Sequence, residues 1–489
     1  MKKLLCVFLA AILLLSSSVF AAAATSQAQY TDATITAKGF DAAALLDANR
    51  TTYTAAKDGE VTVSRKGGIA HVYIEFDRIP AAWSAHDPAS GKTVTCGQNG
   101  FLHEYVDVKA LFGNTPKTLV LQFEEETSIA DVYAFSAGAL PDFVQRWDAP
   151  LDKADILLLS SHSDDEQLFF AGMLPYYAVE RGLQVQVAYV VQHFEANGVK
   201  EHRRPHEQLD GLWTVGVRHY PVMSDFPDLY AESKDRETAF AQAERVFENA
   251  GVTYDDFKAY IITCLRRFKP LVVVSHDVNG EYGHGTHVLA AAALTEAIQA
   301  APKAKEYPES AKTYGTWQVE KTYLHLYEKN KITMDWDTPY ESLGGKTPFE
   351  VTQDGFGCHK SQHWTWFYGW IYGKGTSIKK AADIKSYSPC EYGLYQTTVG
   401  KDKKGGDFME NVTSYEERRQ QALEELQAQQ AQKTTTAKPA TTAPKEVPAA
   451  GDWLPVMLIA LAVVVIIVLI FVICKVSKRN CKHSRRDNH

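Results

Sequence analysis

The chain has 489 residues, of which 45% are hydrophobic and 22% are charged, so it is long enough for two or three globular domains. Its formal net charge of −8 argues against a nucleic-acid-binding protein, because such proteins concentrate Lys and Arg.

The N-terminus has the layout of a secretory signal. Lys2 and Lys3 precede an apolar stretch over 4–15, and small residues end the segment at 22–24. We therefore expect residues 1–24 to be a signal peptide that is removed from the mature protein.

Residues 25–148 carry short apolar or alternating runs separated by Gly, Pro, Asn and Asp. The runs lie at 61–63, 71–76, 105–108, 118–123 and 131–135. This pattern predicts a separate antiparallel β-sandwich domain. The phrase Leu-Leu-Asp-Ala-Asn-Arg-Thr-Thr-Tyr at 45–53 loosely resembles discoidin-like, galactose-binding-type domains. The alternative is a sandwich that only packs on its neighbour.

Over residues 149–410, apolar strand patterns alternate with helical patterns. The predicted strands are 154–159, 185–191 and 271–275, and the predicted helices are 175–181, 237–250, 255–268 and 287–300. Such alternation predicts a mostly parallel sheet with helices on its faces, and hence an α/β domain.

The C-terminal part has the pattern of a membrane anchor on a stalk. Residues 411–452 combine a polar helix, capped by Ser414 and Glu417, with a Thr, Ala and Pro-rich linker. The uncharged segment 453–474 spans about 33 Å as a helix, enough to cross a bilayer. Because the tail 475–489 is basic, we expect it to be cytoplasmic and the catalytic part to be extracellular.

Four cysteines lie between the predicted signal and the predicted anchor, at Cys96, Cys264, Cys358 and Cys390. Four are too few for a disulfide scaffold in a chain of this length. Cys358 and Cys390 are candidates for one bridge, although spacing alone does not fix the pairing. Cys264 has the pattern of a buried helix residue.

Two polar motifs follow apolar strands directly. The first is Ser161-His162-Ser163-Asp164-Asp165-Glu166, after the strand 154–159. The second ends in Gly283-His284-Gly285-Thr286-His287, after the strand 271–275. The acidic run alone could be a helix cap, because Asp accepts the free N–H groups of a helix N-terminus. Loops at the carboxyl ends of parallel strands also form ligand crevices.

The two motifs together offer the ligands of a metal-dependent hydrolase. Zinc binds imidazole and carboxylate groups, and catalytic sites use three protein ligands. His162, Asp165 and His287 would meet that number. Asp164 would remain available as a general base.

The chain resembles the PIG-L (LmbE-like) family of zinc-dependent N-deacetylases, which act on N-acetylglucosamine units. Four of the family's motifs occur in family order, at His162–Glu166, Arg204–Glu207, Gly283–His287 and His359–Gln362. The departures are Ser163, where the family usually has Pro, and Thr286, where it often has Asp; neither is a ligand position.

The resemblance implies a Rossmann-like fold and a set of site residues. The implied ligands of zinc, or of another divalent metal, are His162, Asp165 and His287. The implied catalytic residues are Asp164, as the base, and His284, which would polarise the carbonyl, stabilise the oxyanion or protonate the leaving amine. The implied substrate-binding residues are Arg204, His359 and Gln362.

We therefore expect an extracellular, membrane-anchored N-deacetylase of an N-acetylated sugar or glycan, in a chain whose ends suit a Gram-positive bacterium. The alternatives are a glycan-binding surface protein with a vestigial metal site and a zinc hydrolase of another amide or ester. No G-x-G-x-x-G follows the first strand, so a nucleotide cofactor is not expected.

Some residues near these motifs have weaker patterns. The aromatic-rich segment 362–372 fits either a sugar-stacking platform or a domain core. His193, His202 and His206 match no family position, so we expect them at the surface or at the rim of the pocket.

Overall fold

The structure, a computed structural model, describes residues 26–436 apart from 192–194, 197–198, 201, 230–232 and 234. The predicted signal peptide, transmembrane segment and basic tail lie outside the described residues. Within the described range, none of the helices is both long and apolar enough to cross a membrane. The chain divides into two compact units: one runs to Pro339 and includes Thr347–Val412, and the other combines Tyr340–Lys346 with the chain from Thr413.

The N-terminal part of the first unit consists of two antiparallel sheets. The five-stranded sheet has the order β1 (Thr34–Lys38), β3 (Gly59–Ser64), β8 (Thr118–Phe123), β5 (Trp83–Asp87) and β6 (Lys92–Cys96). The four-stranded sheet has the order β2 (Thr54–Ala56), β9 (Thr127–Phe135), β4 (His71–Phe76) and β7 (His103–Asp107). Side chains of β3 alternate between buried and partly exposed, as in a strand with one face on a core. Phe76 and Phe123 bring the two sheets into contact, with ring centroids 6.2 Å apart.

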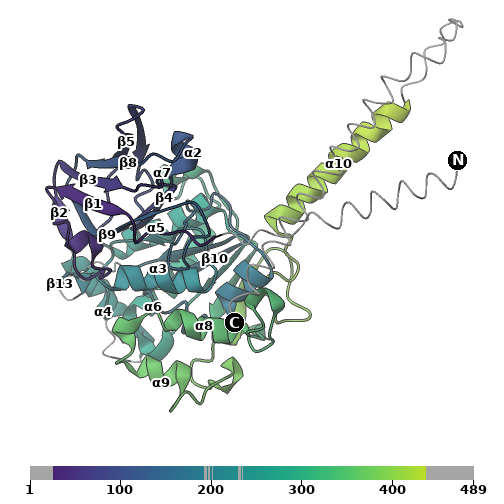
Figure 1. Cartoon of the computed structure of the whole chain (residues 1–489). Helices are drawn as coiled ribbons and strands as arrows, with labels where there is room; N and C mark the ends of the chain where they lie inside the picture. Colours follow the sequence, from purple (N-terminus) through teal and green to yellow (C-terminus); the bar gives the residue numbers. More distant parts are fainter. Residues whose placement is uncertain are drawn as a thin grey trace, which may run out of the picture. The chain divides into compact units, whose positions relative to one another are not determined.

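A seven-stranded sheet forms the centre of the rest of the unit (Figure 1). Its order is β14 (Val222–Met223), β11 (Val185–Tyr189), β10 (Ile156–Ser160), β15 (Val272–Ser275), β16 (Lys321–His325), β18 (Glu391–Thr397) and β17 (Lys331–Thr333). The first five strands are parallel, and β18 runs antiparallel to both of its neighbours. The mixed α/β architecture predicted from the sequence is therefore confirmed.

The order of the parallel strands sets the position of the ligand crevice. β10 comes first in the chain, β11 and β14 lie on one side of it, and β15 and β16 lie on the other. The chain therefore reverses its direction of travel across the sheet between β10 and β15. In open α/β sheets, ligands bind at this switch point, outside the carboxyl ends of the strands.

Helices cover the sheet, and this packing removes their apolar side chains from water. The helices are α3 (Arg204–Thr214), α4 (Arg236–Asn249), α5 (Tyr254–Phe268), α6 (Gly285–Ala300), α7 (Pro308–Tyr314), α8 (Pro348–Phe356) and α9 (Trp366–Tyr372). α5 begins with a capping box of Thr253 and Asp256. Side chains of α5 and α6 share a buried core with those of β10 and β15. Smaller elements are α2 (Val108–Phe112), the hairpin of β12 (Glu195–Ala196) and β13 (Val199–Lys200), and a π-helix over Pro175–Glu180.

The candidate disulfide between Cys358 and Cys390 is not formed in the described part of the chain. Cys358 and Cys390, like Cys96 and Cys264, are free thiols. Cys358 instead contacts Thr214, with Sγ 3.5 Å from Oγ1, while Cys390 is buried beside β18.

The second unit contains α10 (Tyr415–Thr436). Ser414 and Glu417 form the predicted capping pair: Glu417 N donates to Ser414 Oγ at 3.2 Å, and Ser414 N donates to Glu417 Oε2 at 2.7 Å. Most side chains of α10 are exposed, as expected for a polar helix.

Candidate metal centre and active site

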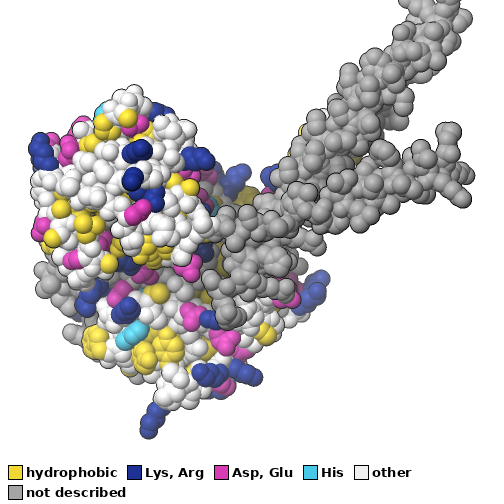
Figure 2. Space-filling view, in the orientation of Figure 1, with side chains coloured by type: hydrophobic (Ala, Val, Ile, Leu, Met, Phe, Trp, Pro, Cys, Tyr) yellow, Lys and Arg dark blue, Asp and Glu magenta, His cyan; other side chains and the backbone are white. Residues whose placement is uncertain are grey.

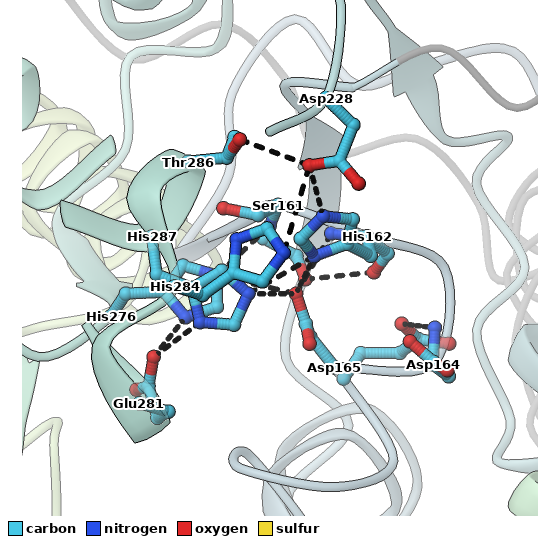
Figure 3. Close-up of polar contacts among 12 residues, drawn as sticks. Ser161, His162, Asp164, Asp165, Asp228, His276, Glu281, His284, Thr286 and His287 are labelled. Atoms are coloured by element: carbon cyan, nitrogen blue, oxygen red, sulfur yellow. Dashed lines mark hydrogen bonds and ion pairs between the residues drawn. The ribbon is translucent and has the colours of Figure 1, made fainter. Parts of the chain in front are cut away.

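The two predicted motif loops meet beside the switch point of the sheet. The loop after β10 carries Ser161 to Glu166, and the loop after β15 carries His276 to His284 and leads into α6. Because β10 and β15 are paired in parallel, both loops leave the same edge of the sheet. Figure 3 shows their side chains pointing toward one another.

Three side-chain atoms form a small triangle at the centre of this site. His162 Nδ1 lies 3.1 Å from Asp165 Oδ2 and 3.0 Å from His287 Nε2. His287 Nε2 lies 3.2 Å from the same oxygen of Asp165. Tetrahedral ligation at bond lengths near 2.1 Å places ligand atoms about 3.4 Å apart, so the three atoms lie near the spacing that a metal ion requires.

The hydrogen bonds around the triangle direct lone pairs into it. His287 Nδ1 lies 2.7 Å from Glu281 Oε2, and His162 Nε2 lies 2.8 Å from Asp228 Oδ1. Each carboxylate fixes its imidazole with the proton on the outer nitrogen, so the inner nitrogen has a free lone pair. Two nitrogen lone pairs and a carboxylate oxygen then face one another, an arrangement that a cation stabilises.

The protonation energetics of the site lead to the same conclusion. Burial opposes protonation of His287, but the carboxylate of Asp165 outweighs it and raises the pKa of His287 to about 9. The site thus attracts positive charge, and a divalent cation would supply it in place of protons.

His276 and His284 border the triangle without completing it. Ser161 N donates to His276 Nε2 at 2.9 Å, which uses the lone pair that a metal would need. The ring of His284 packs edge-on against that of His162 at a centroid distance of 4.6 Å. Both residues lie in compact groups of potential ligands: His284 with His162 and His287, and His276 with Asp165 and His287. The hydrogen bonding therefore favours His162, Asp165 and His287 as the three ligands.

Asp164 lies beside the triangle in a strained conformation. Its φ of 133° is one that residues other than glycine rarely adopt. Its N–H donates to Glu166 Oε2 at 3.0 Å, and its carboxylate lies 3.6 Å from the Arg204 guanidinium. Burial raises the pKa of Asp164 to about 6. A carboxylate with a pKa near neutrality suits a general base.

A buried carboxylate at Glu281 organises the histidines behind the site. Its oxygens lie 2.8 Å from His276 Nδ1, 2.7 Å from His287 Nδ1 and 2.6 Å from His325 Nδ1. Burial alone would raise the pKa of Glu281, but the adjoining histidines hold it well below its usual range. The sequence motifs assigned no role to Glu281 or His325.

Asp228 is a second residue that the sequence did not indicate. In addition to its contact with His162, its Oδ1 accepts a hydrogen bond from Thr286 Oγ1 at 3.0 Å (Figure 3). Thr286, noted above as a departure from the family pattern, thus positions this carboxylate. The only local signal is that Asp228 follows β14, an edge strand of the parallel sheet.

The predicted substrate-binding residues lie at different depths. Arg204 Nη2 donates to Ser163 O at 2.8 Å, so Arg204 contacts the catalytic loop. His359 is buried, with Nε2 3.4 Å from Glu166 Oε1, and lies behind that loop. Gln362 is partly exposed, and its Nε2 donates to Ser361 Oγ at 3.2 Å. Arg204 is the one of the three that reaches the Asp164 carboxylate.

Of the two positions expected for His206, the surface and the rim of a pocket, the first is wrong, and the residue lines a cavity beside the N-terminal sheets. The residue is buried, and its Nδ1 lies 2.7 Å from His103 Nε2 on β7. His206, in the first turn of α3, therefore contacts the four-stranded N-terminal sheet through this pair. His202 contacts Asp77, and His193 lies outside the described residues.

The aromatic segment after His359 borders the site on one side. Trp366 packs against Tyr282 at a centroid distance of 5.6 Å, and Tyr282 packs against His284 at 5.5 Å. Trp364 is 84% exposed, whereas Ile371 is fully buried. The segment therefore combines core positions with exposed rings near the site.

Comparison with known proteins identifies the segment that contains these loops. Residues 157–298 match the model of the PIG-L family, described as GlcNAc-PI de-N-acetylase. A 1D-myo-inositol 2-acetamido-2-deoxy-alpha-D-glucopyranoside deacetylase of Geodermatophilus obscurus is 26% identical over 216 residues, which cover 41% of this chain and 70% of the relative. The protein of the same name from Rhodococcus jostii is 29% identical over 191 residues, covering 36% of this chain and 63%, or less than two thirds, of the relative.

Among solved structures, an N,N'-diacetylchitobiose deacetylase from Pyrococcus horikoshii shows 14% identity and a TM-score of 0.31. The matched part covers 47% of this chain and 83% of that one.

Proposed function

Because residues 157–298 match the model of the PIG-L family, we propose that this chain is a zinc-dependent hydrolase that removes N-acetyl groups from an N-acetylglucosamine-type saccharide. The observation that carries the proposal is the triangle of His162 Nδ1, Asp165 Oδ2 and His287 Nε2, with the carboxylate of Asp164 beside it. The relatives named above are deacetylases of an acetamido sugar, which supports the same substrate class.

The ligand set suits zinc, which binds two imidazoles and a carboxylate with one position left open. A bound divalent cation would lower the pKa of a water molecule and polarise the amide carbonyl. Other divalent metals that accept imidazole and carboxylate are alternatives that metal analysis distinguishes.

The residues of the chain would supply the proton transfers. Asp164, with its pKa raised by burial, can accept a proton from the attacking water. Burial lowers the pKa of His284 well below its usual value, so its imidazole is neutral and can donate a hydrogen bond to the developing oxyanion. Arg204 holds the catalytic loop through Ser163 O and lies where it can contact the sugar.

The cellular setting is proposed from the sequence. The signal pattern over 1–24, the uncharged segment 453–474 and the basic tail support a single-pass membrane protein with an extracellular catalytic part. The two N-terminal sheets support a β-sandwich domain over 25–148, and α10 supports a stalk that begins near 411. An extracellular zinc-dependent deacetylase would have an exported polysaccharide or a cell-surface glycan as its substrate.

Metal analysis and acetate release test this proposal together. The full-length chain, purified in detergent, is expected to contain about one zinc ion per molecule and to release acetate from N-acetylglucosamine oligomers. A metal-free chain, or a metal-loaded chain that cleaves only acyl esters or other amides in a substrate panel, would contradict it.

A further inference from the structure

A cavity of about 1090 Å³ lies between the N-terminal sheets and helix α3. Its walls come from β4, β9, the segment 46–51, the start of α3 and the segment 357–361. None of the predicted metal ligands or catalytic residues lines it. Its volume is slightly above the range of about 300–1,000 Å³ that is typical of small-molecule sites, which often lie between domains.

Three of the charged groups that line this cavity form ion pairs with one another. Arg50 Nη2 lies 2.7 Å from Glu75 Oε1 on β4, and the same guanidinium is hydrogen-bonded to Asp210 on α3. The remaining charged lining residues are Arg203, Lys360 and Glu207, so three groups of each sign line the space. A balanced set favours a neutral ligand over a phosphate or a polyanion. Charges of both signs are also interspersed over the face drawn in Figure 2.

One wall of the cavity is aromatic. The rings of Tyr30, Tyr133 and Phe143 cluster with centroids 5.2–6.0 Å apart. Tyr30 is 37% exposed and Phe143 is 36% exposed, so both rings retain surface that a ligand can cover. Aromatic faces take up the C–H surface of a sugar ring, while paired carboxylates and guanidinium groups bind its hydroxyls.

Helix α3 connects this cavity to the catalytic loop. Glu207 and Asp210 face the cavity, whereas Arg204, on another side of the helix, donates to Ser163 O. Glu207 also accepts a hydrogen bond from Ser361 N at 2.9 Å, which ties the segment 357–361 to the same helix. A ligand in the cavity would therefore lie one helix away from the proposed deacetylation site.

We propose that this cavity is a second saccharide-binding site, which holds a neutral sugar unit between the aromatic wall and the Arg50–Glu75–Asp210 cluster. The choice of a saccharide among neutral ligands rests on the proposed function. The bound unit is either a remote residue of the glycan that is deacetylated or part of a separate glycan that anchors the enzyme to its target.

Direct binding tests the site without turnover. The probes are the N-acetylglucosamine tetramer and monomer, titrated by calorimetry into the full-length chain with Asp164→Asn, or into wild type stripped of metal as a second non-hydrolysing form. Tyr30→Ala and Phe143→Ala should each weaken tetramer binding at least about five-fold, because each removes one aromatic contact. Tyr53→Ala is the matched control: Tyr53 is 42% exposed and does not line the cavity, so binding should not change.

Steady-state kinetics identify the source of the bound sugar. If the cavity variants raise KM for the tetramer and leave the monomer unchanged, one glycan spans both sites. If they weaken direct binding and leave KM unchanged, a separate glycan occupies the cavity. Either result supports the site.

Tetramer binding that is absent, or that is equal in wild type and both cavity variants, would overturn the proposal even if acetate is released. Cavity-dependent binding by a wild-type chain that loads metal but releases no acetate would instead overturn the proposed deacetylase activity and leave this site standing.

Discussion

Asp164 has a buried carboxylate and a backbone conformation that is energetically unfavourable for any residue other than glycine. A φ of 133° costs on the order of 1–3 kcal/mol and persists only where neighbouring contacts enforce it. Here Asp164 N donates to Glu166 Oε2, and Asp164 O accepts from Gln167 N at 2.9 Å. Strain of this kind, at a side chain next to three converging ligand atoms, is typical of a positioned functional group.

Replacing the carboxylate of Asp164 should remove proton transfer while the metal site remains. Asp164→Asn keeps the shape of the side chain, and His162, Asp165 and His287 are unchanged. We expect the rate of acetate release to fall by about 10²–10⁴-fold, the usual contribution of a general base. Zinc content by mass spectrometry should stay at the wild-type level. A variant with full activity would refute the role of Asp164 as the base.

Glu281 should control metal affinity although it is not itself a ligand. Glu281→Gln removes the charge that fixes the ring of His287, and losing such a partner typically weakens metal binding about 10–100-fold. Competition with a chelator measures this affinity. Glu296→Gln, at a surface glutamate that pairs with Lys258, is the matched control and should bind metal normally. Equal affinities in the two variants would show that Glu281 only fills space.

The sequence predicted those site residues that lie in recognisable motifs, although His162 and His287 are 125 residues apart. His162, Asp164 and Asp165 lie in one motif, and His284 and His287 lie in another. The contacts of Asp228 and His325 are distant: His325 and Glu281 are 44 residues apart, and His162 and Asp228 are 66 residues apart. No local pattern encodes such pairs. Glu281 lies only six residues before His287, but no motif gave it a role.

At the scale of elements, the turn between β15 and α6 determines where Glu281 and His284 lie. Gly280 has a φ of +67°, and a Cβ atom there would lie 2.7 Å from His284 O and 2.8 Å from Val288 Cγ2. The turn therefore has no room for a side chain and no freedom to relax away from α6.

Gly280→Ala should displace the loop and reduce both metal content and acetate release by at least about ten-fold, because small misplacements of catalytic groups have large kinetic effects. Gly251→Ala is the matched control: Gly251 also has a positive φ, +76°, but a Cβ there would meet no atom within 4 Å. That variant should lose only about 1 kcal/mol of stability and keep its activity. If both variants behave alike, the close contacts at Gly280 are not what positions the loop.

A buried strand can be predicted from its own sequence when it is apolar, but not when it contains polar residues whose partners lie far along the chain. β10, β11 and β15 are almost entirely apolar, so their sequences alone predict buried parallel strands. β16 is equally buried but contains Lys321 and His325, whose partners are Asp402 and Glu281. These polar residues give the segment the pattern of an exposed stretch, so the strand was not predicted. Their partners come from distant segments, which the local sequence does not show.

At the scale of the whole first unit, polar contacts join the N-terminal sheets to the catalytic part. Leu102 N donates to Tyr220 OH at 3.0 Å, and His103 is bonded to His206. The partners are 118 and 103 residues apart. The sequence predicted two separate domains but not the contacts between them. An isolated histidine or tyrosine has the same sequence pattern at an exposed surface as at an interface.

The buried histidine pair at this boundary should make the stability of the unit depend on pH. Burial lowers the pKa of His206 to about 3, against about 6.5 in an unfolded chain, and also lowers the pKa of His103. Between these pH values the unfolded chain binds more protons than the folded one, so stability rises with pH and is lost as pH falls from about 6.5 toward 3. From His206 alone, the free energy of unfolding should fall by roughly 2 kcal/mol between pH 7 and pH 5.

His206→Asn tests this linkage with a non-titrating amide in place of the ring. We expect the variant to be less stable than wild type at pH 7, because the packing of the imidazole ring is lost. Between pH 7 and pH 5 the variant should lose less stability than wild type, as measured by urea unfolding at the two pH values. His86→Asn, on β5 where the ring contacts Thr93, is the control and should keep the wild-type pH dependence. A structural role alone would lower the stability of His206→Asn equally at both pH values. If the free energy of unfolding changes with pH in the variant as it does in wild type, the histidine pair does not couple protonation to the contact between the N-terminal sheets and α3.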